Sequence, residues 1–183
     1  MTKIDSLLKA YQKHIKIPWR EDASPMERVW FCVYDENDEL LLRSKIEEFE
    51  LATIQNNHQW ELYDLTDSFA NWLSKEKYAE SYFKNPKLLN TILPRYASFL
   101  TAEINKFIGS QNIDDNTVFA IHGVGSLFGL LKVKNFVERI APLVKGRLLI
   151  FFPGSYEDNN YRLLDGYDGW NYLAVPILSD YDE

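Results

Sequence analysis

The sequence contains little that would cross-link or anchor a chain. Its single cysteine, Cys32, cannot close a disulfide within the chain, and one cysteine with three scattered histidines gives no zinc-ligand cluster. No apolar run approaches the roughly 20 residues that span a bilayer, and the N-terminus lacks the apolar block of a signal peptide. We therefore expect a soluble cytoplasmic protein that folds without a disulfide, a metal or a cofactor.

An excess of basic residues is also missing. The chain has 20 Lys and Arg against 27 Asp and Glu, a net charge of -7, which disfavours direct nucleic-acid binding. Such binding would require one basic face made by Lys132, Lys134, Arg139 and Lys145. The negative charge is uneven, since residues 154–183 hold seven acids and one base. The sequence thus predicts a nearly neutral body with an acidic C-terminal end.

What the 183 residues do contain is the pattern of one α/β domain, residues 1–183. With 46% hydrophobic residues the chain can build a full core. Three continuous apolar, β-favouring runs predict buried strands over residues 29–34, 117–122 and 147–152. Two weaker strand candidates are residues 59–63 and 172–177. Pro176 favours an edge position for the last strand. The sequence predicts a three-layer α/β sandwich, with a mostly parallel central sheet of about five strands and helices on both faces.

Helical spacing of apolar residues fills the intervals between these strands. It predicts an amphipathic helix over residues 3–16, a helix of about 18 residues after Asp38, and two or three helices before Gly109. A further helix before Gly146 is expected to end there in a left-handed cap. Residues 157–169 are predicted to form an acidic loop.

A glycine turn follows the strand that ends at His122. Ligands of open parallel sheets bind beyond the carboxyl ends of the strands, so Gly123, Gly125 and Ser126 are candidates for an anion contact. However, no Lys-Ser/Thr completes a Walker A loop, and Phe128 stands where a dinucleotide fingerprint needs its third glycine. A structural turn with Ser126 as a helix N-cap is the favoured interpretation. Phosphate or nucleotide binding is the alternative.

No catalytic constellation stands out from the sequence. Gly-Val-Gly-Ser is not the Gly-x-Ser-x-Gly of a nucleophile elbow, and His14 and His58 have no partners at ligand spacing. Cys32 lies inside an apolar strand, where a thiol is inert. We therefore expect no catalytic residues, no metal site and no enzymatic activity.

Aromatic side chains make up 15% of the chain, and several lie in or beside the acidic loop. Large rigid rings in polar loops are enriched at protein interfaces. This pattern makes a partner-binding edge a hypothesis with five candidate residues, Tyr161, Asp165, Tyr167, Asp168 and Trp170.

Two segments of the C-terminal half also resemble a known family. The run Val118–Phe136, with its Gly-Val-Gly turn, and the run Leu148–Tyr156, ending in Phe-Pro-Gly-Ser-Tyr, are similar to the signature region of BrxB proteins. These are small components of BREX bacteriophage exclusion systems. Tyr34–Arg43 also resembles the first strand-to-helix junction of the family, and the chain length fits.

The resemblance implies an accessory role in phage defence. The implied partners are a PglZ-like protein of phosphatase type, a large ATPase and a methyltransferase complex. No catalytic residue can be carried over from the family. The resemblance thus predicts a non-enzymatic adaptor that acts through protein–protein contacts.

Overall fold

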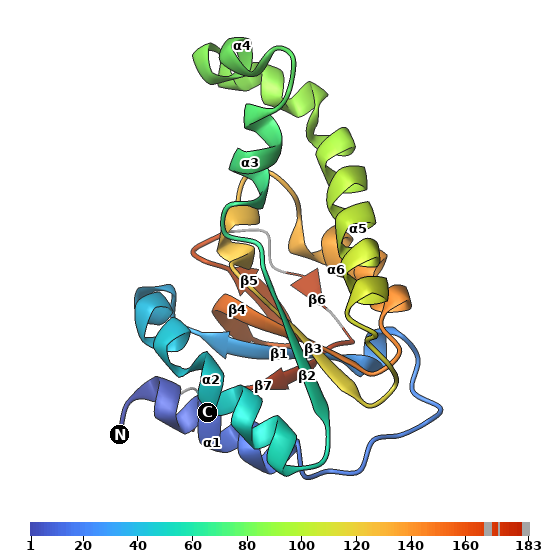
Figure 1. Ribbon diagram of the computed structural model, residues 1–183. Helices are drawn as coiled ribbons and strands as arrows, with labels where there is room; N and C mark the ends of the chain where they lie inside the picture. The colour runs from blue at the N-terminus through green and yellow to red at the C-terminus, as the bar shows by residue number, and fades with distance from the viewer. Residues whose placement is uncertain (167–169, 172, 181–183) are drawn as a thin grey trace.

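Five parallel strands form the central sheet of the computed structural model, in the order β2-β3-β4-β1-β7 (Figure 1). The structure describes residues 1–166, 170–171 and 173–180. The strands are β1 (Val29–Tyr34), β2 (Gln59–Asp64), β3 (Thr117–His122), β4 (Arg147–Glu157) and β7 (Val175–Ile177). The predicted α/β class and mostly parallel sheet are confirmed.

Burial along the strands follows their position in the sheet. Every residue of β1 and β3 is buried, as are the first seven residues of β4, because helices cover both faces of these central strands. Strand β2 lies at one edge and is only half-buried. Strand β7 lies at the other edge and contains Pro176, so the predicted edge position is correct.

Helices α1 (Lys3–His14) and α2 (Glu39–Gln55) cover one face of the sheet (Figure 1). A capping box starts α1: the Thr2 hydroxyl accepts the Asp5 amide, and the Asp5 carboxylate accepts the Thr2 amide. The buried stripe of α1 packs with α2 and the rings of β1 and β4. Two short 3-10 turns flank β1, η1 (Met26–Arg28) and η2 (Glu36–Asp38).

The opposite face is covered by α3 (Ser68–Ser74), α5 (Leu93–Ser110) and α6 (Val133–Ile140). Between α3 and α5 the chain forms α4 (Ala79–Lys84) and the 3-10 helix η3 (Pro86–Thr91). These two elements stand away from the sheet, at the far end of α3 and α5 (Figure 1). We name residues 75–91 the projection tip.

The segment after Pro153 differs from the predicted loop. Strand β4 continues to Glu157 and pairs antiparallel with β5 (Asn160–Leu163), which pairs in turn with β6 (Trp170–Asn171). Asp158 and Asn159 take positive φ values of 50° and 63° in the turn, a conformation that Asp and Asn tolerate well. These strands are short and rich in polar residues, so their sequence does not distinguish them from a loop.

Gly146 is required for a different reason from the one predicted. Its φ is not positive, and the preceding helix already ends at Ile140, followed by the 3-10 turn η5 (Ala141–Leu143). A Cβ on Gly146 would lie 2.1 Å from the carbonyl oxygen of Thr117. Glycine therefore permits the close approach of β4 to β3, and it does not serve as a left-handed cap.

Of the helices that the structure describes, none combines the length and apolar character needed to cross a membrane.

Candidate functional site

Polar side chains end three strands at the carboxyl edge of the sheet. Asp64 of β2 lies beside His122 of β3, and Tyr34 ends β1 on the other side of β4. The connection after β1 leads to α2 on one face, whereas the connection after β3 leads to α6 on the other. Because the connections that follow β3 and β1, on either side of β4, leave to opposite faces, this edge is where open α/β sheets bind ligands.

Two residues of α2 join these strand ends into one polar network. The Tyr34 hydroxyl donates to the Glu39 carboxylate, and Arg43 Nε donates to the same carboxylate over 2.8 Å. Arg43 also donates to Thr66 Oγ1 over 2.7 Å. Thr66 Oγ1 donates to Asp64 over 2.5 Å.

His122 completes the network. Its Nε2 is 3.6 Å from Asp64 Oδ2, and its buried Nδ1 has no hydrogen-bond partner among the residues that the structure describes. Burial lowers the pKa of His122, and the Arg43 charge acts in the same direction, although Asp64 opposes both. The imidazole is therefore held in its neutral form at neutral pH.

The carboxylate and the phenol of the network also titrate abnormally. Burial works to raise the pKa of Asp64, but the hydrogen bonds from Thr66 and the charges of His122 and Arg43 lower it overall. Burial, reinforced by Glu39, raises the pKa of Tyr34 well above its ordinary value. The network thus contains a charged carboxylate, a neutral imidazole and a neutral phenol.

A neutral imidazole beside a carboxylate could accept a proton, but in the described part of the chain no hydroxyl forms a hydrogen bond with His122. The hydroxyl of Ser126 donates to the carbonyls of Leu65 and Gly123. Burial raises the pKa of the Cys32 thiol, which suits an inert side chain. Within the described residues, no three or more His, Cys, Asp or Glu side chains are arranged to hold a metal ion.

The glycine turn is packed against this network. Gly123 has a φ of 82°, and a Cβ there would lie 2.6 Å from Thr66 Oγ1 and 3.0 Å from Asp64 Oδ1. The chain then forms a 3-10 turn, η4 (Val124–Leu127), and α6 begins only at Val133. The predicted N-cap role of Ser126 is wrong, because Ser126 lies inside this turn. Anion contact by Gly123, Gly125 and Ser126 stays a prediction.

The five residues of the predicted partner edge fall into different environments. Tyr161 is fully buried, donates its hydroxyl to the carbonyl of Ala174, and packs edge-on against Phe31. It is a core residue of the hairpin and offers no surface. Asp165 is exposed. Tyr167 and Asp168 lie outside the described residues, as does the side chain of Trp170, whose backbone forms part of β6.

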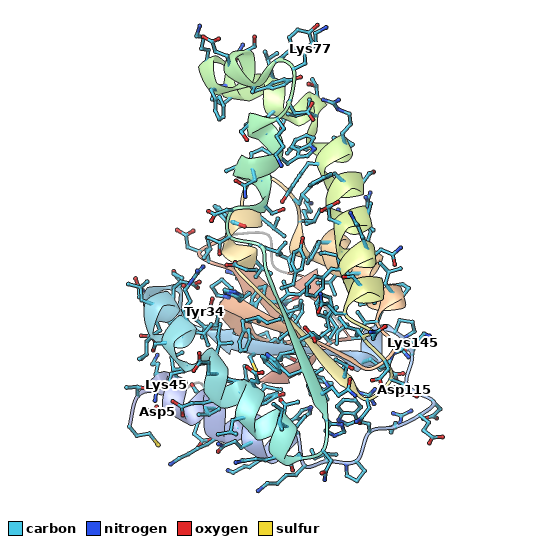
Figure 2. The ribbon with its side chains drawn as sticks, viewed as in Figure 1. Asp5, Tyr34, Lys45, Lys77, Asp115 and Lys145 are labelled. Atoms are coloured by element: carbon cyan, nitrogen blue, oxygen red, sulfur yellow. The ribbon has the colours of Figure 1, made fainter. Side chains whose placement is uncertain are left out.

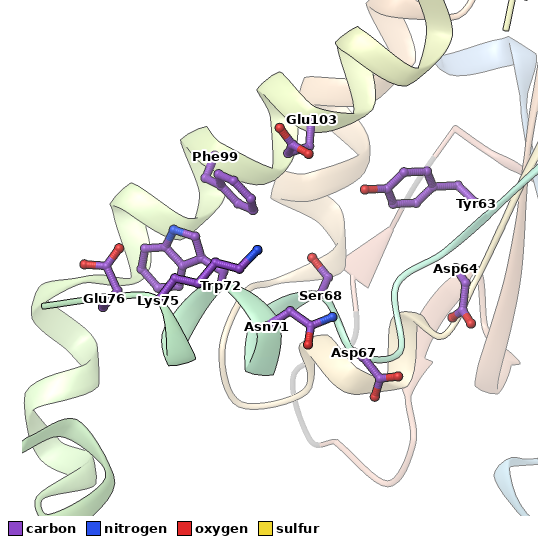
Figure 3. Close-up of a pocket in the computed structure, with 10 residues that line it drawn as sticks. All are labelled: Tyr63, Asp64, Asp67, Ser68, Asn71, Trp72, Lys75, Glu76, Phe99 and Glu103. Atoms are coloured by element: carbon purple, nitrogen blue, oxygen red, sulfur yellow. The ribbon is translucent and has the colours of Figure 1, made fainter. Parts of the chain in front are cut away.

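A pocket that sequence reasoning missed opens between the β2–α3 connection and α5 (Figure 3). It has a volume of about 570 Å³ and is lined by Tyr63, Asp64, Asp67, Ser68, Asn71, Trp72, Lys75, Glu76, Phe99 and Glu103. Four carboxylates and one lysine line this space, and one carboxylate, Glu76, pairs with Arg95 over 2.8 Å, so the remaining negative charge favours a cation over an anion. The lining comes from two segments that only the fold brings together.

The projection tip was also missed as a surface. Tyr78, Phe83 and Leu88 are 59%, 63% and 40% exposed. Their sequence neighbours Tyr82 and Leu89 pack against the core. In such short helices the sequence does not show which apolar side chains face inward, because that depends on where the core lies.

The structure brings together only two of the four residues of the hypothetical basic face. Lys132 and Arg139 line the same small pocket between α5 and α6, but Lys134 lies beside Glu138, 4.0 Å away. Lys145 follows η5, beyond the end of the helix. The structure therefore gives no support to a continuous basic stripe.

A mainly parallel sheet with helices on both faces and a polar network at its carboxyl edge places the chain among three-layer α/β proteins. A family model described as BREX protein BrxB matches residues 59–177, more than half of the chain. The chain belongs to the BrxB family, so it is a component of a BREX phage-defence system, and the resemblance seen in the sequence is confirmed. Comparison with curated proteins and with solved structures found no match.

Proposed function

We propose that this chain is a non-enzymatic adaptor of a BREX complex and acts through protein–protein contacts. Membership of a BREX system implies association with other BREX components. We take the PglZ-like protein, the large ATPase and the methyltransferase complex as the candidate partners. The observation that carries the proposal is the projection tip, with its exposed Tyr78, Phe83 and Leu88.

The tip is a folded surface with apolar groups turned outward. Tyr82 and Leu89 pack against the core, and Arg95 bonds Glu76 over 2.8 Å where α3 meets α5. Burying a large apolar side chain contributes roughly 1.5–3 kcal/mol, so burial under a partner would stabilise a complex. Aromatic residues are also the commonest anchors of protein interfaces.

The acidic hairpin is a second candidate surface for the same role. Glu157, Asp158 and Asp165 are exposed there, while Tyr161 holds the hairpin to the core. This surface would complement a basic patch on a partner.

The alternative function is phosphate or nucleotide binding at the Gly123–Ser126 turn. The Asp64 carboxylate, 3.0 Å from the position of a Gly123 Cβ, would repel an anion there. A thermal-shift screen with nucleotides and inorganic phosphate tests this alternative directly, because a ligand at about 100 times its dissociation constant adds roughly 2.7 kcal/mol. A saturable stabilisation lost in Ser126→Ala would support it.

The adaptor role is tested by co-expressing the tagged chain with each candidate partner and measuring binding to the purified components. We expect the double variant Tyr78→Ser with Phe83→Ser to bind at least about tenfold more weakly, a loss of about 1.4 kcal/mol. The matched control is Leu51→Ser with Ile54→Ser. These residues are 53% and 52% exposed on α2, which covers the other face of the sheet.

Circular dichroism and urea unfolding should show that both double variants remain folded. If no BREX component binds the wild-type chain, the adaptor role is abandoned. If the tip and control variants weaken binding equally, the tip does not carry the contact.

A further inference from the structure

The charges around the exposed rings of the projection tip are not balanced. The tip has four lysines, Lys75, Lys77, Lys84 and Lys87, and two acids, Glu76 and Glu80. Both acids are already neutralised: Glu76 by Arg95 over 2.8 Å, and Glu80 by Lys84 over 2.7 Å.

Three lysines of the tip remain, and one of them, Lys75, lines the pocket beside Trp72. Lys75, Lys77 and Lys87 are exposed and form no ion pair with any residue that the structure describes. Lys77 lies over the ring of Tyr78, with its Nζ 5.3 Å from the ring centroid. Figure 2 shows Lys77 at the far end of the projection, well away from Tyr34 at the sheet edge. The tip is thus a basic, apolar surface on a protein whose net charge is -7.

We infer that the projection tip docks into an apolar hollow with an acidic rim on a partner protein. This inference rests on the proposed adaptor role and names the chemistry of the partner surface. Tyr78, Phe83 and Leu88 supply the buried contact area. Lys77 and Lys87 pair with the rim carboxylates, steer the approach of the partner and fix its orientation.

Two other occupants are less consistent with these observations. Nucleic acid would meet the repulsion of the negative chain as a whole, and three lysines do not form a phosphate-tracking groove. A second copy would have to offer its acidic hairpin to the tip. Such a head-to-tail contact joins two different surfaces and would continue into a ring or an open filament. A different protein with an acidic surface is therefore the occupant that the charges favour.

The test is charge reversal in the full-length chain, with association and dissociation rates measured against the BREX component that binds the wild type. The tip variant carries Lys77→Glu and Lys87→Glu. The matched control carries Lys9→Glu and Lys16→Glu, two exposed lysines in and just after α1, so both variants reach the same net charge. Rates are compared from about 50 to about 300 mM NaCl, where screening shortens from about 14 to about 6 Å.

We expect the tip variant to raise Kd about tenfold or more, mainly through a slower association rate, and to flatten the dependence of that rate on salt. The control should stay within about twofold of the wild type. Equal weakening in both variants would show an effect of overall charge and overturn the inference. Unchanged binding in the tip variant would overturn it too, yet would leave the adaptor role intact. If the wild type binds no BREX component, both proposals fall together.

Two further measurements distinguish the other occupants. Light scattering after size exclusion would reveal a second copy as a mass that rises with concentration and falls in the tip variant. Anisotropy of a labelled single-stranded oligonucleotide would reveal a nucleic-acid surface as binding at low salt that the tip variant loses. Either result would overturn the docking of an acidic protein.

Discussion

The sheet body and the projection tip use the same kinds of side chain in opposite ways. In the body, Phe151 of β4 is fully buried and packs against Phe49 and Trp60. In the tip, Phe83 is 63% exposed. The polar groups differ as well, since the Tyr34–Glu39–Arg43 chain is closed by hydrogen bonds, whereas Lys77 and Lys87 face solvent. In the body these side chains fill the core, whereas in the tip they are exposed and free for the contact that we propose.

The largest expected effect contrasts these two phenylalanines directly. Phe151→Ala removes a fully buried ring and should lower the free energy of unfolding by about 3–5 kcal/mol. Phe83→Ala removes an exposed ring and should change it by less than about 0.5 kcal/mol. Urea unfolding followed by circular dichroism measures both. A loss of several kcal/mol in Phe83→Ala would mean that the tip belongs to the core.

A second pair of variants compares two glycines: one in the body, where a Cβ has no room, and one in the helix that supports the tip, where a Cβ has room. Gly146→Ala places a Cβ 2.1 Å from the Thr117 carbonyl, so β3 and β4 must shift, and stability should fall by about 1–3 kcal/mol. Gly109→Ala in α5 meets nothing within 4 Å and should stabilise by about 0.4–1 kcal/mol. Thermal unfolding should therefore move in opposite directions for the two variants. A stabilised Gly146→Ala would contradict the close strand packing.

The smallest expected effect is on the pH dependence of the free energy of unfolding. Buried groups of the body should contribute to this dependence, and the tip should not. Folding lowers the pKa of His122 from its ordinary 6.5, chiefly by burial, so the unfolded chain binds this proton more tightly. The stability contributed by a neutral His122 is therefore complete above pH 6.5 and is lost as the pH falls below that value.

Urea unfolding between pH 5 and 8 should show this loss in the wild type and a shallower slope in His122→Gln. The remaining slope comes partly from His14, whose pKa is also lowered, first by burial and then by Arg147. Asp64 acts in a separate window, because its lowered pKa affects stability only as the pH falls through the range near and below 3.8. An identical slope in wild type and variant would remove His122 from the set of buried titrating groups.

Much of the fold was predictable because the signals were local. The continuous apolar runs of β1 and β3 were predicted at the bounds that the structure shows, since a strand covered on both faces admits few polar residues. Pro176 indicated an edge strand, because proline cannot donate to a central ladder. The Gly-Val-Gly and Phe-Pro-Gly-Ser-Tyr segments led to the correct family.

The candidate site was less predictable because its contacts are long-range. Arg43 and Thr66 are 23 positions apart, and no local pattern joins them. Tyr161 was interpreted as a loop aromatic, yet the hairpin turn at Asp158 and Asn159 brings it into the core. Gly146 was expected to take a left-handed conformation, but a neighbouring strand decides its role.

The sequence by itself determined the α/β class, the central strands, the uneven charge and the BrxB family, because each depends on composition or on short-range order. Only the tertiary structure decided which aromatic rings are core and which are surface. Burial depends on what packs against a side chain: of the sequence neighbours Tyr82 and Phe83, the first packs against the core and the second is exposed. For the same reason the sequence alone does not show that the tip has an excess of positive charge at its surface. That excess follows from the ion pairs of Glu76 with Arg95 and of Glu80 with Lys84.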